Sequence, residues 1–131
     1  LALPPGHPLT RKRTVGANDL KGERLIVMKD GHCLGDQVLG FCDRHDLHHR
    51  ISFRSAQLET IQALVRAGLG ISLIPAMAVQ LNRKDGPEYR ALRSPKPSRQ
   101  IVTVWPAQRP PGRAADELLK IVSASFKHDR R

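Results

Sequence analysis

Short runs of branched apolar residues alternate along this chain with longer stretches that carry the apolar period of a helix. The strand-like runs lie at residues 24–29, 49–54, 71–74, 88–93 and 100–105. The helix-like stretches lie at 33–46, from Ser55 to the glycines at 68 and 70, and at 113–127. Strands that alternate with helices of about ten to fifteen residues build βαβ units. The sequence therefore predicts the α/β class, with a mostly parallel sheet flanked by helices.

The segments between these elements give weaker signals. Residues 1–19 contain three prolines and a basic run at 11–13 but no sustained period, so we expect an extended segment without a helix. Ser55 is expected to cap the second helix, with Glu59 near the capping-box position. Residues 76–81 have room for one or two helical turns.

The length and composition fit one globular domain. Of the 131 residues, 40% are apolar and only 4% are aromatic, so Leu, Ile, Val and Ala must fill the core. Charged residues interrupt every apolar run before it reaches the roughly 18 residues that span a bilayer. The first residues do not have the pattern of a signal peptide. With two cysteines, the chain fits a reducing, cytoplasmic setting better than a disulfide scaffold.

The formal charge of +10 suggests an anionic partner at first sight. The basic residues are scattered through predicted loops, however, and no groove-reading helix or interleaved aromatic residues accompany them. We therefore do not expect these residues to bind DNA directly.

Both cysteines lie in one predicted helix. Cys33 falls in its first turn beside His32, where the unpaired backbone N–H groups favour a reactive thiolate. Cys42 follows nine residues later, about 13 Å along the axis and half a turn out of phase. A disulfide needs Cα atoms within roughly 7 Å, so joining the two would unwind the helix. Gly35 and Gly40 lie between them and lower the cost of unwinding.

Two other interpretations of these residues remain open at this point. Cys42 can be a small core residue and Cys33 an inert thiol. A zinc site could draw on Cys33, Cys42, His45, His48 and His49, but eight residues separate the cysteines, unlike the two to four of structural zinc sites. We expect no metal and no cofactor.

The segment Asp-Gly-His-Cys-x-x-Asp-Gln-x-x-Gly-Phe-Cys at 30–42 resembles the redox helix of the OxyR-like, peroxide-sensing LysR-type transcriptional regulators. Residues 19–23 and the stretch from 55–60 through 67–76 also resemble the effector domain of that family. The resemblance implies a periplasmic-binding-protein-like fold. Residues 1–105 would form its second α/β subdomain, and residues 106–131 a linker and C-terminal helix returning toward the first. The winged helix-turn-helix of the family does not appear in this chain.

The resemblance also implies roles for individual residues. Cys33 would be oxidised by peroxide to a sulfenic acid, and Cys42 would resolve it as a disulfide. His32 would flank the peroxide pocket, Asp36 would hydrogen-bond near it, and Arg99 would help to polarise the thiolate.

The chain departs from the family pattern at one position. Gly35 stands where the peroxide sensors carry an arginine, two residues after the first cysteine. Loss of a nearby cation lowers the thiolate fraction, so we expect slower oxidation by peroxide and partial recovery in Gly35→Arg.

The function implied is that of an inducer-sensing regulatory domain and not of an enzyme. Its ligand would be hydrogen peroxide or another small inducer, and the full-length protein would be a homo-oligomer that binds promoter DNA through a domain missing here. An alternative is an effector domain for a small anionic metabolite, with Arg54 and Arg99 holding a carboxylate and the cysteines idle. A thiol peroxidase is a third possibility, which would require turnover and a reductant.

Overall fold

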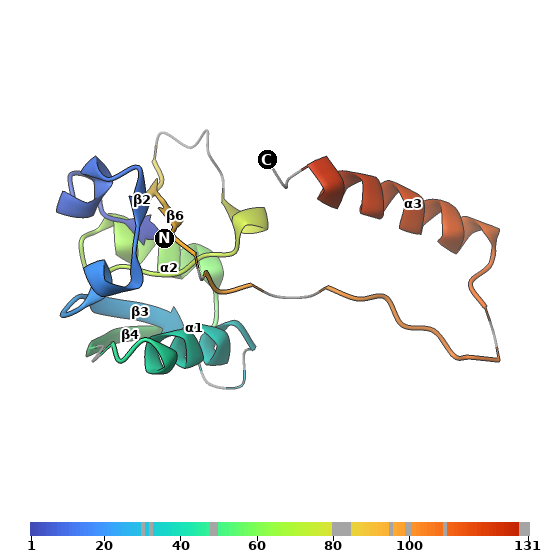
Figure 1. Cartoon of the computed structure of the whole chain (residues 1–131), viewed down its shortest axis with the longest axis horizontal. Helices are drawn as coiled ribbons and strands as arrows, with labels where there is room; N and C mark the ends of the chain where they lie inside the picture. The colour runs from blue at the N-terminus through green and yellow to red at the C-terminus, as the bar shows by residue number, and fades with distance from the viewer. Residues whose placement is uncertain are drawn as a thin grey trace. The chain divides into compact units, whose positions relative to one another are not determined.

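The computed structural model describes residues 1–29, 31, 33–47, 50–79, 85–94, 96–98, 101–108 and 110–128. The chain divides into two compact units, Leu1–Ser98 and Arg99–Arg131 (Figure 1). The first unit contains the strands β1 (Ala2–Leu3), β2 (Thr14–Val15), β3 (Arg24–Met28), β4 (Arg50–Ser55), β5 (Glu88–Tyr89) and β6 (Ala91–Leu92). Its helices are α1 (Cys33–Arg44) and α2 (Leu58–Arg66), and its short 3-10 helices are η1 (Pro8–Arg11), η2 (Ala17–Leu20) and η3 (Ala76–Ala78).

The strand β3 forms the centre of the first unit. It pairs in parallel with β4 on one side and, through Leu25, with Ile71 on the other. Ser72 then pairs antiparallel with Ala2 of β1, and β1 pairs antiparallel with β5. A separate parallel pair joins β2 to β6. The segments nearest to β3 are therefore parallel, and the α/β prediction is confirmed.

From Leu25 to Met28 the side chains of β3 are buried on both faces of the sheet, as this apolar run predicts. One core cluster joins β3 to α1 through Leu25, Val27, Val38, Phe41 and Cys42. A second core cluster joins it to α2 through Ile26, Met28, Ile61 and Val65. Alternate residues of β3 thus face different helices, and Figure 1 shows α1 and α2 on opposite sides of this strand.

The N-terminal segment contributes more than the sequence predicts. Residues 1–19, expected to contain no helix, include η1 and most of η2, and Leu3 and Val15 are fully buried. The Nδ1 atom of His7 accepts a hydrogen bond from the Leu9 amide at 3.2 Å and caps η1. A 3-10 helix of one turn is too short to show a repeating apolar pattern in the sequence. This explains why the prediction of no helix in residues 1–19 is wrong.

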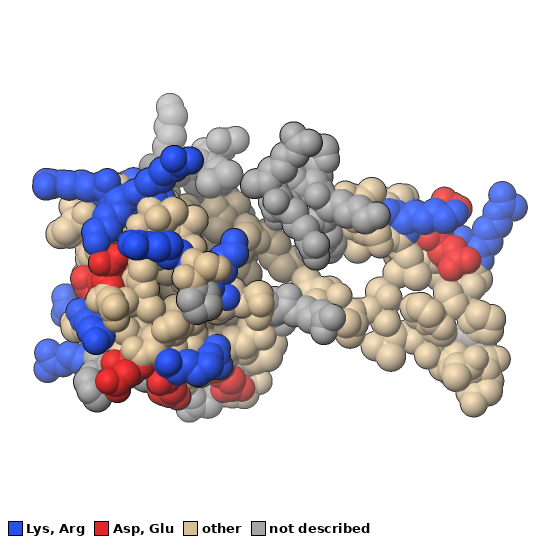
Figure 2. Space-filling model, viewed as in Figure 1, with Lys and Arg blue, Asp and Glu red and all other residues tan. Residues whose placement is uncertain are grey.

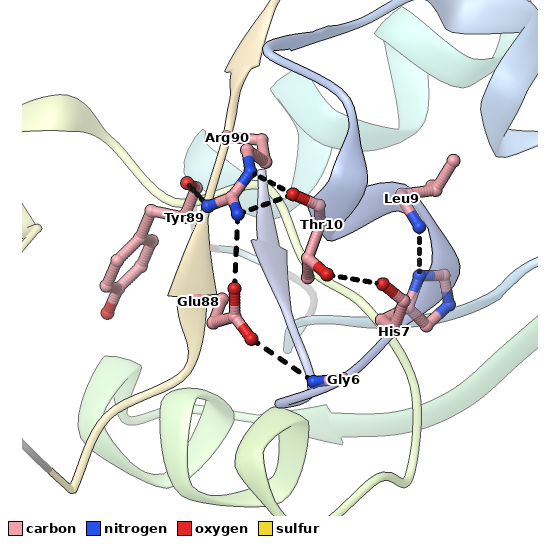
Figure 3. Close-up of polar contacts among 7 residues, drawn as sticks. All are labelled: Gly6, His7, Leu9, Thr10, Glu88, Tyr89 and Arg90. Carbon is pink, nitrogen blue, oxygen red and sulfur yellow. Dashed lines mark hydrogen bonds and ion pairs between the residues drawn. The ribbon is translucent and has the colours of Figure 1, made fainter.

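A hydrogen-bond network holds this segment against β5 (Figure 3). The Arg90 guanidinium donates to the Thr10 carbonyl from Nε at 2.8 Å and from Nη2 at 2.5 Å. Its Nη2 also contacts Glu88 Oε2 at 3.2 Å, and Glu88 Oε1 accepts from the Gly6 amide at 3.1 Å. Residues about 80 positions apart in sequence are joined in this way.

The predicted helix from Ser55 begins later than expected. The helix α2 starts at Leu58 with Gln57 as its N-cap, and Ser55 belongs to β4. The Ser55 hydroxyl accepts from the Gln57 amide at 3.1 Å, so it stabilises the turn before the helix instead of capping the helix itself.

The later strand predictions are only partly confirmed. Residues 88–93 form two short strands, because β5 pairs with β1 and β6 pairs with β2. Of residues 71–74, only Ile71 and Ser72 form bridges, and of residues 76–81 only η3 is helical among those described. Residues 101–105 form no strand, since no described segment pairs with them. A branched apolar run becomes a strand only where a neighbour supplies hydrogen bonds.

The second unit contains α3 (Arg113–His128), as predicted for 113–127. Leu118, Ile121 and Val122 lie at helical spacing along it and are 60%, 65% and 38% exposed. No helix in the described part of the chain has the length and apolar character needed to cross a bilayer. The subdomain boundary expected between residues 105 and 106 stays a prediction.

Candidate redox site

The candidate site begins where β3 ends and α1 starts. Gly31 has a φ of +86°, in the left-handed region that favours glycine, and it turns the chain from the strand into the helix. Cys33 is the first residue of α1 and is exposed. Asp36 is exposed in the same turn, where a carboxylate interacts favourably with the helix N-terminus. The site thus lies at the carboxyl end of a parallel strand, a usual position for functional residues in α/β proteins.

Cys42 has the opposite environment. It is 1% exposed and packs in the core cluster between α1 and β3. Burial raises the pKa of the Cys42 thiol, and the neighbouring Asp43 carboxylate raises it further. Cys42 is therefore held as a neutral thiol at physiological pH, and the exposed Cys33 is the better candidate for a nucleophile.

The helix keeps the two cysteines apart. No disulfide joins them, and both lie on the continuous α1. Nine residues of α-helix separate them by about 13 Å and half a turn, which agrees with one thiol being exposed and the other buried. A bond between them requires α1 to unwind.

Cys42 takes part in the hydrogen bonds that end α1. Its carbonyl oxygen accepts hydrogen bonds from the amides of His45 at 3.2 Å and Leu47 at 3.0 Å. Asp46 adopts a φ of +50°, the left-handed conformation that often ends a helix. The rings of Phe41 and His45 lie 4.6 Å apart on the same turn. Moving Cys42 therefore disturbs both the helix end and the core.

The structure brings three of the predicted site residues onto α1, namely Cys33, Cys42 and Asp36. His32 and Arg99 lie outside the described residues. Sequence reasoning did not assign Gly35 to either face of the helix, whereas the structure buries it against β3. Its spacing of three and seven residues from the buried Val38 and Cys42 is the signal that could have located it on the core face.

The alternative sites gain no support from the described residues. No group of three or more His, Cys, Asp or Glu side chains that could hold a metal is found among them. His48 and His49 of the zinc interpretation lie outside the described residues, and α1 separates Cys33 from Cys42. Arg54 of the metabolite interpretation is exposed on β4. On the face drawn in Figure 2, basic side chains are spread over the first unit with acidic ones among them.

The fold and the site together define a class of protein. The family model of the LysR substrate binding domain matches residues 1–127. The chain therefore belongs to this family and is a regulatory domain of the LysR type, with the periplasmic-binding-protein-like fold that the resemblance implied.

The similarity extends to individual members of the family, which are named OxyR. The DNA-binding transcriptional dual regulator OxyR of Escherichia coli K12 is 38% identical over 125 residues, which cover 95% of this chain. A structure of the oxidised form of OxyR is 42% identical with a TM-score of 0.58, covering 73% of this chain and 46% of that chain. A reduced OxyR from Neisseria meningitidis is 26% identical with a TM-score of 0.61, covering 72% and 43%. The chain spans 35% to 41% of the length of such curated relatives.

Proposed function

We propose that this regulatory domain senses hydrogen peroxide through a reversible disulfide between Cys33 and Cys42. The observation that carries the proposal is the contrast between the two thiols on one helix. Cys33 is exposed at the start of α1, and Cys42 is buried in the core nine residues later. The names of its relatives, which include hydrogen peroxide-inducible genes activators, point in the same direction.

The chemistry proceeds in two balanced steps. The Cys33 thiolate attacks one peroxide oxygen, the O–O bond breaks, and a sulfenic acid forms as the second oxygen leaves and is protonated to water. The Cys42 thiol then attacks the Cys33 sulfur, the S–O bond breaks, and a second water leaves. One peroxide is thereby reduced by two electrons as two thiols become one disulfide. The buried thiol reacts second because it must first leave the core.

Three further residues assist the first step in this proposal. Asp36 lies in the first turn of α1 with Cys33, and its proposed role is to hydrogen-bond groups near the peroxide, as the resemblance implies. His32 flanks the peroxide pocket and Arg99 helps to polarise the thiolate, as the resemblance implies.

The disulfide changes the fold of α1, because the intact helix holds the cysteines too far apart. In the longer protein this rearrangement alters the contacts between subunits of a homo-oligomer and so the binding of promoter DNA by the winged helix-turn-helix domain. The domain acts as a sensor that reacts once per reduction and not as a peroxidase that turns over.

Titration with hydrogen peroxide tests the proposal, with free thiols counted by mass spectrometry. The unsubstituted chain should lose two thiols together and 2 Da in mass. Cys33→Ser should form no intramolecular disulfide, and Cys42→Ser should accumulate a sulfenic acid at Cys33 that dimedone traps. Retention of both thiols at peroxide concentrations that oxidise a known sensor would refute the proposal and favour the metabolite-binding alternative.

A further inference from the structure

We infer that Gly35 is a positioning residue of the redox site, an inference that rests on the proposed function. Gly35 lets the first turn of α1 lie directly on the backbone of β3, and this contact sets the balance between the dithiol and the disulfide. A glycine in the interior of a helix otherwise only weakens it.

The contact between Gly35 and β3 is unusually close. A Cβ atom built on Gly35 would lie 2.9 Å from the carbonyl oxygen of Met28 and 3.4 Å from both its carbonyl carbon and its Cβ. Real Cβ atoms essentially never approach another atom to under 3.0 Å, and here the atom belongs to the backbone of a central strand. The strand is fixed on both sides by its neighbours, so the helix is the element that must move.

The position of Gly35 ties this contact to the cysteines. It lies two residues after Cys33, and with Val38 and Cys42 it forms the buried face of α1. A displacement of α1 at Gly35 therefore moves the turn that carries Cys33 and loosens the packing of Cys42. Both changes weaken the arrangement that keeps the thiols apart.

Gly40 offers a matched control on the same helix. A Cβ atom there would meet only the Nη1 atom of Arg44, at 3.4 Å, and the Arg44 side chain is exposed and flexible enough to move aside. Alanine at either position should favour the helix through its higher propensity. Only at position 35 does the added methyl group overlap the strand backbone.

The two substitutions should consequently shift the thiol–disulfide balance in opposite directions. Gly40→Ala stabilises α1. It should therefore shift the equilibrium between dithiol and disulfide about fivefold toward the dithiol. Gly35→Ala destabilises the helix that exists only in the dithiol, because overlap with backbone outweighs the gain in propensity. We expect a shift of about tenfold toward the disulfide, which corresponds to about 30 mV for a two-electron couple.

The experiment equilibrates the full 131-residue chain and both variants with mixtures of reduced and oxidised glutathione. Two glutathione thiols form for each disulfide made in the chain, and trapped thiols are counted by mass. Hydrogen exchange on the reduced proteins is measured in parallel. The amides of α1 should lose protection in Gly35→Ala and gain it in Gly40→Ala, while those of α2 report whether the domain is folded.

Each outcome decides the inference. Opposite shifts of the two variants support it, and shifts in the same direction overturn it. If the unsubstituted chain forms no disulfide, the proposed function fails, and protection of α1 in the reduced variants then decides whether Gly35 positions the helix. If Gly35→Ala alone does not fold, the double variant with Gly40→Ala is compared with Gly40→Ala, and a shift toward the disulfide is again required.

Discussion

Cys33 and Cys42 are chemically alike but differ in access to solvent. We expect an alkylating reagent at neutral pH to label Cys33 at least tenfold faster than Cys42, because Cys42 is 1% exposed and burial raises its pKa. Mass spectrometry of the peptides over time measures both rates. In concentrated urea the two thiols should react at similar rates, which serves as the control. Equal labelling in the native protein would contradict the assignment of roles.

Asp19 links the pH of the solution to the stability of the first unit. Hydrogen bonds from Lys12 Nζ at 2.6 Å and from the Gly16 amide at 2.9 Å lower the pKa of the Asp19 carboxyl. A carboxyl whose pKa is lower in the folded than in the unfolded state contributes stability above its unfolded value of about 4, and this contribution disappears as the pH falls through the folded value.

Asp19→Asn should therefore lower the free energy of unfolding by about 0.5 kcal/mol at pH 7 and by progressively less below about pH 4. Urea denaturation of both proteins between pH 3 and pH 7 measures the difference. Asp85→Asn is the control, because the Asp85 side chain is 77% exposed and its ion pair with Arg66 should contribute little. A difference for Asp19→Asn that does not change with pH would rule out the charge as its cause.

The Gly35 contact changes one expectation from the sequence. From the sequence alone, Gly35→Arg is expected to restore a cation and part of the rate of peroxide oxidation. Any side chain at this position meets the Met28 carbonyl, so the substitution also displaces α1. Its effect on the rate therefore combines a charge with a movement of the helix, whereas Gly35→Ala tests the movement alone.

At the scale of elements, α1 is the part of the fold that the proposed oxidation would change. We expect the amides of α1 to lose protection from hydrogen exchange when the disulfide forms, because nine residues of helix cannot bring Cys33 and Cys42 within bonding distance. The amides of α2 should keep their protection and act as an internal control. Unchanged protection of α1 after complete disulfide formation would mean that the disulfide does not unwind this helix, and the proposed switch would be wrong.

The elements that the sequence predicts well are those whose periods are long enough to detect. The unbroken apolar run of β3 and the helical spacing of α1 and α3 place these elements within a few residues of their observed bounds. The short η1 leaves no period, and residues 101–105 have a strand-like composition but no pairing partner among the described residues. The helical spacing of Gly35 from Val38 and Cys42 indicates the core face of α1, but how closely Gly35 approaches β3 depends on tertiary packing, which this spacing does not encode.

At the scale of the whole first unit, Arg90 joins the N-terminal segment to β5. Arg90→Met should lower the free energy of unfolding by about 2 kcal/mol, since the guanidinium makes charge-assisted bonds to the Thr10 carbonyl and to Glu88. Thermal or urea denaturation measures the loss. Arg93→Met is the control, because the Arg93 side chain is 64% exposed and its contact with Asp19 is 3.9 Å long. Equal losses in the two variants would show that the network in Figure 3 contributes little.

The burial of Cys42 has a consequence for how the proposed sensor would return to its reduced state. Cys42 packs with Val38, Phe41 and two residues of β3, so the reduced helix is held by the hydrophobic core itself. If a reductant cleaves the proposed disulfide, the free energy of burying Cys42 again favours its return to the core and the refolding of α1. The recovery time of the proposed signal is then set by the rate of reduction, because folding one helix takes microseconds or less.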